Sequence, residues 1–317
     1  MPYTFASGAI NAKSANLFSE TEYLTLSKTD KSEYLKVLRD FGYGFDHVSY
    51  YLDEVITNEQ IKTKTELIRI VPNIEIIRLW YLKYDLINIK LLLKNHLFSK
   101  SNDLTFDKQA VIPIHELKEG IINNEFSKVS EQNTELLRLL REVFELKDLT
   151  SEQLSNQVDA VVYAYILKEA KKYREEALVT YLENLIDANN LITLYRAQKI
   201  NFTLDHFKSH LVSGGRVDLD IFKNIYNLRY DEQIDQLKLH YHEDVINVIR
   251  GFNEKEDLSL LDQTLKQALI SSINNYKYDT FSSGPLIYYL LAKEYEINNV
   301  RLLYFDKEVE VANLLKY

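Results

Sequence analysis

The sequence has 317 residues, of which 46 % are hydrophobic and 27 % are charged, and its formal net charge at pH 7 is −9. The length suits one large domain or two to three small ones, and an acidic chain is not expected to bind nucleic acid through a broad basic face. Because cysteine is absent, the chain has no disulfide, no thiolate zinc site and no cysteine nucleophile.

Glycine and proline are scarce, with 8 and 4 residues, which favours helices over a turn-rich sheet. Tyrosine is abundant at 23 residues, which suits helix interfaces and partner surfaces but is equally explained by the composition of the source genome. The N-terminal stretch lacks the basic segment and apolar core of a secretory signal. The longest uncharged apolar runs, such as residues 160–167, are far shorter than the ~18 residues that a membrane span needs. We therefore expect a chain that is soluble or peripheral to another structure.

The N-terminal third contains two clear helical patterns. The first covers residues 33–40 and ends at Phe41-Gly-Tyr-Gly44, since glycine commonly follows a helix C-terminus. A polar helix or loop continues to residue 69. Val71-Pro72 interrupts it, because the residue before proline is pushed out of helical geometry. From residue 73 to residue 98, aliphatic residues at alternating spacings of three and four predict a helix that is buried on most sides.

The remainder of the chain shows helical periodicity between short breaks. Predicted helical stretches cover residues 134–146, 157–199, 229–250, 258–278 and 288–305. Residues 105–120 form a loop with Pro113 and Gly120, and Thr150-Ser-Glu-Gln153 is a helix start signal. Ser213-Gly-Gly215 and Ser282-Ser-Gly-Pro285 are the clearest breaks. No convincing strand is found, so the expected fold class is all-α.

Three of the predicted helices carry an acidic residue three positions before an asparagine, among apolar neighbours. The pairs are Asp85 and Asn88, Asp187 and Asn190, and Glu296 and Asn299. Upstream of each pair an apolar residue precedes an aspartate, at Asp53, Asp159 and Asp262. Both landmarks recur at intervals of roughly a hundred residues, the size of a small domain. We therefore predict three helical modules, covering residues 1–106, 107–212 and 213–317.

The spacing of each pair suggests its role. Residues three positions apart share one face of a helix. A buried carboxylate or amide without a hydrogen bond costs on the order of 1–3 kcal/mol, so each pair needs a partner. We interpret the pairs as ties between their helices and neighbouring segments. We prefer this role to a ligand or ion site made by several copies, because an ion site would need more converging oxygen ligands.

Catalytic and metal-binding patterns are weak. His206 and His210 have the spacing of two metal ligands, beside Asp205, but no glutamate follows the first histidine and no third ligand is apparent. We interpret them as surface histidines. His240 and His242 cannot share a helix face. No phosphate-binding loop, dinucleotide fingerprint or nucleophile elbow occurs. We therefore predict no catalytic, cofactor-binding or metal-binding residue, and no enzyme.

The segment from Gly284 to Leu303, GPLIYYLLAKEYEINNVRLL, resembles the C-terminal signature of the family formed by the C subunits of prokaryotic A-type and V-type ATPases and the eukaryotic d subunits. Residues 33–44 are similar to the N-terminal module of that family. The length and the threefold repeat also fit, so the resemblance covers essentially the whole chain. The sequence departs from the family near the N-terminus, where Ala9-Ile-Asn-Ala-Lys13 stands in place of the expected arginines. This departure puts a basic contact at that edge in doubt.

The resemblance implies an all-α protein whose three pseudo-threefold-related modules form a funnel-shaped socket. It implies a non-catalytic central-rotor component, without a cofactor or direct ATP contact, peripheral on the cytoplasmic face of the membrane. Its partners would be the D and F subunits of the central shaft and the membrane rotor ring of c/K-type subunits. It would pass torque between them for the transport of protons or sodium ions. Arg216, after the double glycine, is a candidate partner contact, although a solvated loop is the simpler interpretation.

Two other functions stay open at this point. One is a helical-repeat protein-binding adaptor unrelated to ion transport, and the other is an all-helical enzyme with an unrecognised site. Binding to a D–F shaft would favour the rotor function over both. Loss of binding on chelation would instead favour a metal site at His206 and His210.

Overall fold

The computed structural model describes residues 3–44, 50–98, 104–255 and 257–317, and its regular elements are helices. No strand occurs in these ranges, which confirms the all-α prediction. The chain forms two compact units, Met1–Ile77 with Ile273–Tyr317, and Arg78–Ser272. None of the helices in the described part of the chain combines the length and the apolar character that a membrane span requires.

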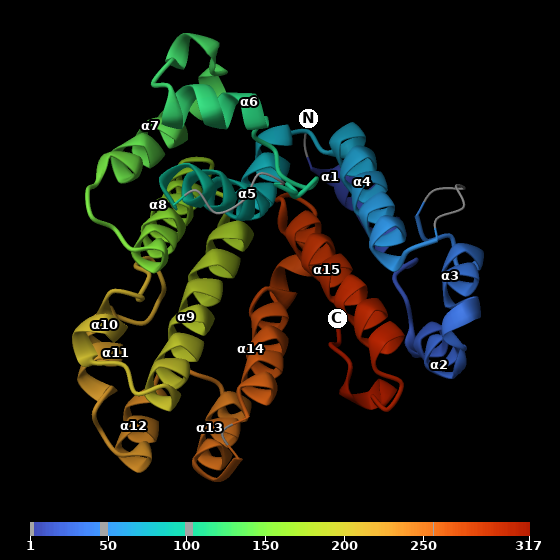
Figure 1. Ribbon diagram of the computed structural model, residues 1–317. Helices are drawn as coiled ribbons and strands as arrows, with labels where there is room; N and C mark the ends of the chain where they lie inside the picture. Colours follow the sequence, from blue (N-terminus) through green and yellow to red (C-terminus); the bar gives the residue numbers. More distant parts are fainter. Residues whose placement is uncertain (1–2, 45–49, 99–103, 256) are drawn as a thin grey trace. The chain divides into compact units, whose positions relative to one another are not determined.

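The first unit is built around one long apolar helix. Its elements are α1 (Thr4–Ser14), α2 (Glu20–Lys28), α3 (Lys31–Asp40), α4 (Leu52–Ile70), the start of α5 (Ile74–Phe98), a 3₁₀ turn (Asn274–Tyr278), α15 (Gly284–Phe305) and a second 3₁₀ turn (Val311–Asn313). The helix α15 contacts α1 and α2 (Figure 1). Most of its 22 residues are buried, including the polar residues Lys293, Glu296 and Asn299, so this helix is surrounded by the rest of the unit. Val300 and Leu303 of α15 pack with Leu26, Tyr34 and Leu38.

The second unit is a series of packed helices. Most of α5 belongs to it, together with α6 (Ile114–Leu117), a π-helical turn (Lys118–Ile122), a 3₁₀ turn (Phe126–Lys128), α7 (Glu131–Glu145), α8 (Ser151–Lys172), α9 (Glu176–Lys199), α10 (Leu204–Lys208), α11 (Leu219–Ile225), α12 (Tyr230–Leu237), α13 (Glu243–Lys255) and α14 (Leu258–Ser272). The helix α8 packs against α7 and α9, and α14 packs along α9 (Figure 1).

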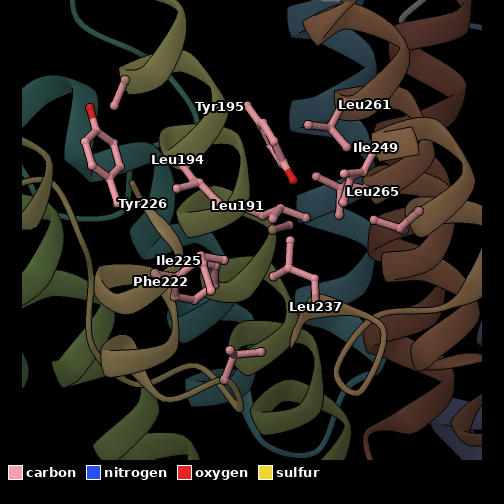
Figure 2. Close-up of a cluster of buried hydrophobic side chains, with 14 of the residues drawn as sticks. Leu191, Leu194, Tyr195, Phe222, Ile225, Tyr226, Leu237, Ile249, Leu261 and Leu265 are labelled. Atoms are coloured by element: carbon pink, nitrogen blue, oxygen red, sulfur yellow. The ribbon is translucent and has the colours of Figure 1, made fainter. Parts of the chain in front are cut away.

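The core of the second unit forms on both sides of α9. Figure 2 shows Leu191 and Leu194 of α9 with Phe222 of α11 on one side and with Leu261 and Leu265 of α14 on the other. All five side chains are buried. Burial of a leucine or phenylalanine side chain contributes about 1.5–3 kcal/mol, so this cluster holds α11 and α14 against α9.

The glycine-rich end predicted for the first helix is confirmed. Gly42 has a φ of 78°, in the left-handed region that favours glycine. The N–H of Tyr43 donates to the carbonyl of Leu38 at 3.0 Å, which closes the last turn of α3. The same closure follows α8, where the N–H of Glu175 donates to the carbonyl of Ala170 at 3.0 Å. There Arg174 takes the left-handed conformation, with a φ of 58°.

The periodicity over residues 157–199 therefore belongs to two helices. A non-glycine residue at the left-handed position between them leaves no visible break in the sequence. The predicted helix over residues 258–278 is also shorter than expected. It ends at Ser272, and a 3₁₀ turn follows.

The expectation of one helix over residues 229–250 is wrong. The helix α12 ends at Leu237, whose carbonyl accepts from the N–H groups of both His240 and Tyr241. The hydroxyl of Tyr241 donates to the carbonyl of Asp187 at 2.9 Å, and α13 then begins at Glu243. The tie of Tyr241 to α9 overrides the helical pattern of the sequence.

Candidate functional site

The three predicted asparagines make the same contact. Each is buried on a long helix and holds one residue further along the chain, accepting from its backbone N–H and donating to its carbonyl. The pairs are Asn88 with Asp107, Asn190 with Val212, and Asn299 with Leu315, at distances from 2.7 to 3.1 Å. The held residue follows its asparagine by 19, 22 and 16 positions. Each asparagine thus satisfies both the backbone N–H and the backbone carbonyl of a residue that lies outside any helix.

The acidic residues of the second unit hold the same loops at a second point. Asp85 accepts from the N–H groups of Val111 and Ile112, both at 2.9 Å. Asp187 accepts from the N–H of Arg216 at 2.9 Å and of Val217 at 3.1 Å. In both loops these amides lie four and five positions after the residue held by the asparagine. One acid and one asparagine therefore fix two points of each loop.

The third pair uses a distant segment. The carboxylate of Glu296 accepts from the N–H of Phe18 at 2.7 Å, across 278 positions of sequence. Phe18 lies two positions before α2, as Ile112 lies two positions before α6 and Val217 two before α11. Each acid thus holds the backbone just ahead of a helix. For Glu296 that helix is α2, near the start of the chain.

Glu296 also belongs to a buried ion cluster in the first unit. The ammonium of Lys293 lies 2.6 Å from Glu296 and 2.6 Å from Glu59, and the side chains of Lys293, Glu296 and Glu59 are 10 %, 0 % and 7 % exposed. Burial alone would lower the pKa of Lys293, but Glu296 and Glu59 outweigh it and hold the pKa above its usual range. Glu59 in turn accepts from the N–H of Gly44 at 2.7 Å. The cluster therefore joins α4, α15 and the loop after α3.

Lys293 and Glu59 were not among the residues predicted from the sequence. The available signal was a lysine three positions before a glutamate, directly after the apolar run of residues 285–292 in α15. A charged residue on a helix that is buried all round needs an opposite charge nearby. That signal indicates a buried ion pair at Glu296, but it does not identify Glu59, which is distant in sequence.

The double glycine has a packing role beside Asp187. Gly214 has a φ of 106°, and a Cβ atom on it would lie 2.7 Å from Leu167. A Cβ atom on Gly215 would lie 2.0 Å from Oδ1 of Asp187 and 2.9 Å from its Cγ. The loop can reach the carboxylate only because no side chain stands at these positions. The side chain of Arg216 itself is exposed, while its backbone N–H is held by Asp187.

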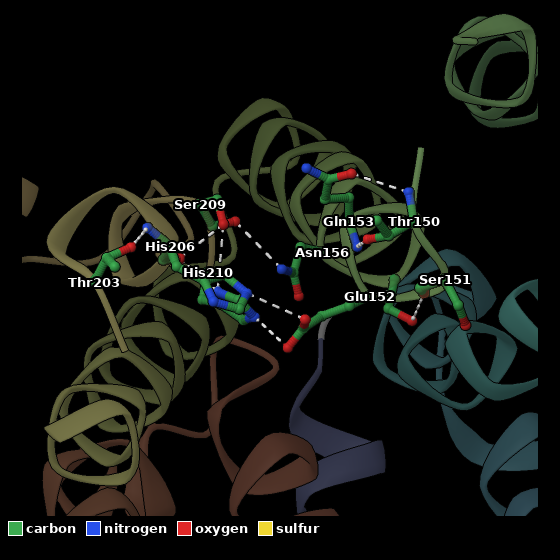
Figure 3. A network of polar contacts seen from close by, with 10 residues as sticks. Thr150, Ser151, Glu152, Gln153, Asn156, Thr203, His206, Ser209 and His210 are labelled. Atoms are coloured by element: carbon green, nitrogen blue, oxygen red, sulfur yellow. Dashed lines mark hydrogen bonds and ion pairs between the residues drawn. The ribbon is translucent and has the colours of Figure 1, made fainter. Parts of the chain in front are cut away.

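The histidines flagged in the sequence lie together with a third side chain. Figure 3 shows His206 and His210 facing Glu152, which comes from the first turn of α8. Sequence reasoning did not reveal Glu152, because it lies 54 and 58 positions away from the two histidines. His240 and His242 are exposed and lie in the segment between α12 and α13.

Comparisons with known proteins agree with one another. A model of the ATP synthase (C/AC39) subunit family matches residues 6–312. The chain is 24 % identical to the C subunit of the A-type ATP synthase of Methanosarcina acetivorans over 251 residues, 76 % of this chain and 68 % of that protein. For the C subunit of Thermococcus gammatolerans the identity is 27 % over 165 residues, 50 % of this chain and 43 % of the relative, so that match spans less than half its length. For the C subunit of Methanosarcina mazei it is 24 % over 336 residues, 99 % of this chain and 91 % of the relative.

Removal of one asparagine should destabilise the protein. The substitution Asn190→Leu leaves the N–H and the carbonyl of Val212 without their partner. We expect the free energy of unfolding to fall by about 2–4 kcal/mol, since each unsatisfied group costs about 1–3 kcal/mol. Chemical denaturation measures this. The matched control is Asn184→Leu on the same helix, whose amide donates only to the carbonyl of Thr180 one turn earlier. An Asn190→Leu protein as stable as the control variant contradicts the tie.

Substitution at Gly215 should also be costly. The added Cβ of Gly215→Ala displaces either the loop or the carboxylate of Asp187. We expect a loss of about 1–3 kcal/mol in the free energy of unfolding. Gly251→Ala in α13 is the matched control, because within the described part of the chain no atom outside the backbone of that helix lies within 4 Å of the new methyl group. There alanine should stabilise the helix by up to about 1 kcal/mol. Equal effects of the two substitutions would refute the close approach at Gly215.

The stability contributed by Asp187 should depend on pH. Burial raises the pKa of this carboxyl from 3.8 to about 6, against the opposing effect of the N–H groups of Val217 and Arg216. Between those two values the unfolded chain has lost the proton and the folded protein keeps it. The stability therefore falls as the pH rises, by about 1.4 kcal/mol per pH unit for this group, and levels off above the folded pKa.

The variant Asp187→Asn isolates this effect, because it cannot titrate. We expect the difference in free energy of unfolding, wild type minus variant, to decrease by about 1–3 kcal/mol between pH 4 and pH 6.5. Urea denaturation of both proteins at several pH values measures it. A difference that stays constant or increases over this range shows that burial does not dominate at Asp187.

Proposed function

Since the chain belongs to the ATP synthase (C/AC39) subunit family, we propose that it is the central-rotor component that seats the D–F shaft on the membrane rotor ring. In this proposal it is non-catalytic, lies peripherally on the cytoplasmic face of the membrane, and transmits torque for ion transport. The observation that carries the proposal is the extent of the family match, which covers residues 6–312 of 317. Hydrolysis or synthesis of ATP would then belong to other subunits of the complex.

The three acid–asparagine pairs support a division of the chain into three similar modules. The residues held by the first two asparagines, Asp107 and Val212, coincide with the predicted boundaries between residues 1–106, 107–212 and 213–317. Each long helix is tied to backbone that leads into a following short helix, and the last, α15, is tied to the segment that leads into α2. We infer a closed series of three modules, which suits a funnel-shaped socket for a shaft.

The nature of the ties suits the transmission of torque. A rotor component must resist bending at the joints between its modules. In this proposal each acid–asparagine pair crosses such a joint with hydrogen bonds between buried side chains and backbone, which are worth about 1 kcal/mol apiece. The ion cluster of Lys293, Glu59 and Glu296 adds a further link at the third joint. Breaking a buried ion pair by removing one partner costs about 3–5 kcal/mol, so this joint should be the stiffest.

Arg216 is the partner contact that we propose for the shaft. Its side chain is exposed, while its loop is fixed by the bonds of Asp187 to the N–H groups of Arg216 and Val217. Because the loop backbone is already fixed, binding would have to order only the side chain of Arg216 and not the loop that carries it. The contact would be with an acidic group, and it would weaken as the salt concentration rises.

Reconstitution tests the proposal. The purified chain is titrated with a D–F complex and, separately, with the detergent-solubilised membrane ring, and binding is followed by calorimetry. We expect dissociation constants at or below the micromolar range for both. Arg216→Ala should weaken binding of D–F by about tenfold, which corresponds to one lost charge contact of about 1.4 kcal/mol.

The matched control for this contact is Arg229→Ala, which removes another exposed arginine of the same unit. It should leave D–F binding unchanged. Failure of the wild-type chain to bind D–F at tens of micromolar would contradict the rotor function and favour an adaptor unrelated to ion transport. Equal losses in the two arginine variants would retain the rotor function but remove Arg216 as its contact.

A further inference from the structure

Three side chains with metal-binding chemistry converge on the surface of the second unit. They are Glu152 in the first turn of α8, His206 in α10, and His210 just after α10 (Figure 3). One ligand atom from each lies within 4.8 Å of the other two. Nε2 of His206 is 3.2 Å from one oxygen of Glu152, and Nε2 of His210 is 2.7 Å from the other. None of these residues belongs to the acid–asparagine ties.

The ring of His210 has a defined orientation. Its Nδ1 lies 2.7 Å from the backbone carbonyl oxygen of His206. A carbonyl oxygen can only accept a hydrogen bond, so Nδ1 carries the hydrogen. In the neutral ring Nε2 then carries a lone pair, and this lone pair faces a carboxylate oxygen at 2.7 Å. Two such acceptors repel each other unless the ring gains a proton and Nε2–H donates to Glu152, or a metal ion binds both atoms.

The same arrangement is usual for histidines that bind metals. In such sites one ring nitrogen binds the ion while the other donates to a backbone carbonyl or a carboxylate, which fixes the tautomer and the ring orientation. His206 is also held in place, because Phe202 stacks on its ring with the centroids 4.0 Å apart and the planes 20° apart. The two imidazoles are therefore oriented before any ion arrives, which lowers the cost of binding.

The N-termini of α10 and α8, which carry the three residues or lead to them, are both capped. The hydroxyl of Thr203 accepts from the N–H of His206. At the start of α8, Thr150 and Gln153 bond each other's backbone N–H groups, at 3.1 Å and 2.9 Å. Asn156 donates to the carbonyl of Ser209 at 3.3 Å, which joins α8 to the segment of the histidines. The distance between Glu152 and the histidines is thus set by contacts other than their own.

We propose that Glu152, His206 and His210 form a binding site for one divalent transition-metal ion of the Zn²⁺ class. Two imidazoles and one carboxylate suit Zn²⁺, whereas Mg²⁺ and Ca²⁺ prefer oxygen ligands alone. The side chains of Glu152 and His206 are 49 % and 41 % exposed and that of His210 is 14 % exposed, so water can complete the coordination. The ion would join the start of α8 to the segment that leads to Val212, the residue held by Asn190. It would thereby stabilise the loop that carries Arg216.

Titration of the metal-free full-length chain with ZnCl₂ tests the site. Calorimetry should give one ion per chain, and saturation should raise the melting temperature by a few degrees, because a ligand that binds only the folded state stabilises it. The double variant His206→Ala/His210→Ala should lose at least a hundredfold in affinity, and Glu152→Gln about tenfold. MgCl₂ should have no effect on any of these proteins. Melting curves without metal check that each variant is folded.

The matched control is His240→Ala/His242→Ala, which removes two exposed histidines of the same unit and should bind Zn²⁺ as the wild type does. Equal affinity in the two double variants would overturn the proposal, since Zn²⁺ would then bind elsewhere. So would the absence of Zn²⁺ binding to the wild type. If the wild type exceeds the His206→Ala/His210→Ala variant in melting temperature only at acidic pH and without any response to Zn²⁺, the cation between His210 and Glu152 is a proton, and the metal site is rejected.

Discussion

The hydrogen bonding of buried loop backbone is the constraint on which the structure depends. A segment that runs between packed helices has N–H and C=O groups that neither a helix nor a sheet satisfies, and each unpaired group costs about 1–3 kcal/mol. In this chain one asparagine and one acid, a single helical turn apart, satisfy such segments at two points. An asparagine suits the first point because its amide both donates and accepts, and a carboxylate suits the second because it only accepts.

The third pair, Glu296 and Asn299, also joins an N-terminal segment to a C-terminal helix, because Glu296 accepts from the N–H of Phe18. Glu296 needs a cation as well as an N–H because its side chain is completely buried, and Lys293 supplies that cation while Glu59 shares it. The first and last helices thereby become parts of one unit. Under the torque that we propose this protein carries, the connection would resist separation of the N-terminal and C-terminal segments of the first unit.

Much of the fold could be predicted from the sequence, and the partners of the pairs could not. The period of the apolar residues identified α5 and α15, and the spacing of Asp85 and Asn88 indicated a shared, hydrogen-bonded face. The atoms that they hold are backbone atoms, which leave no trace in the residue type. The double glycine was interpreted only as a break, and the close approach of Gly215 to Asp187 is visible only in the structure. Breaks at Arg174 and Tyr241 escaped prediction because neither residue is a usual helix terminator, and Glu152 escaped because only the folded chain brings it to His206 and His210.

Native-state hydrogen exchange, read residue by residue, tests the central claim most directly. The amides of Asp107, Val212 and Leu315, held by asparagines, and those of Val111, Val217 and Phe18, held by acids, lie outside regular helices. We predict that these six amides exchange as slowly as the amides at the centres of α9 and α15, while the exposed residues Ser213 and Gly214 exchange quickly. Rapid exchange at the six held positions would contradict the account, because the loops would then open independently of the helices.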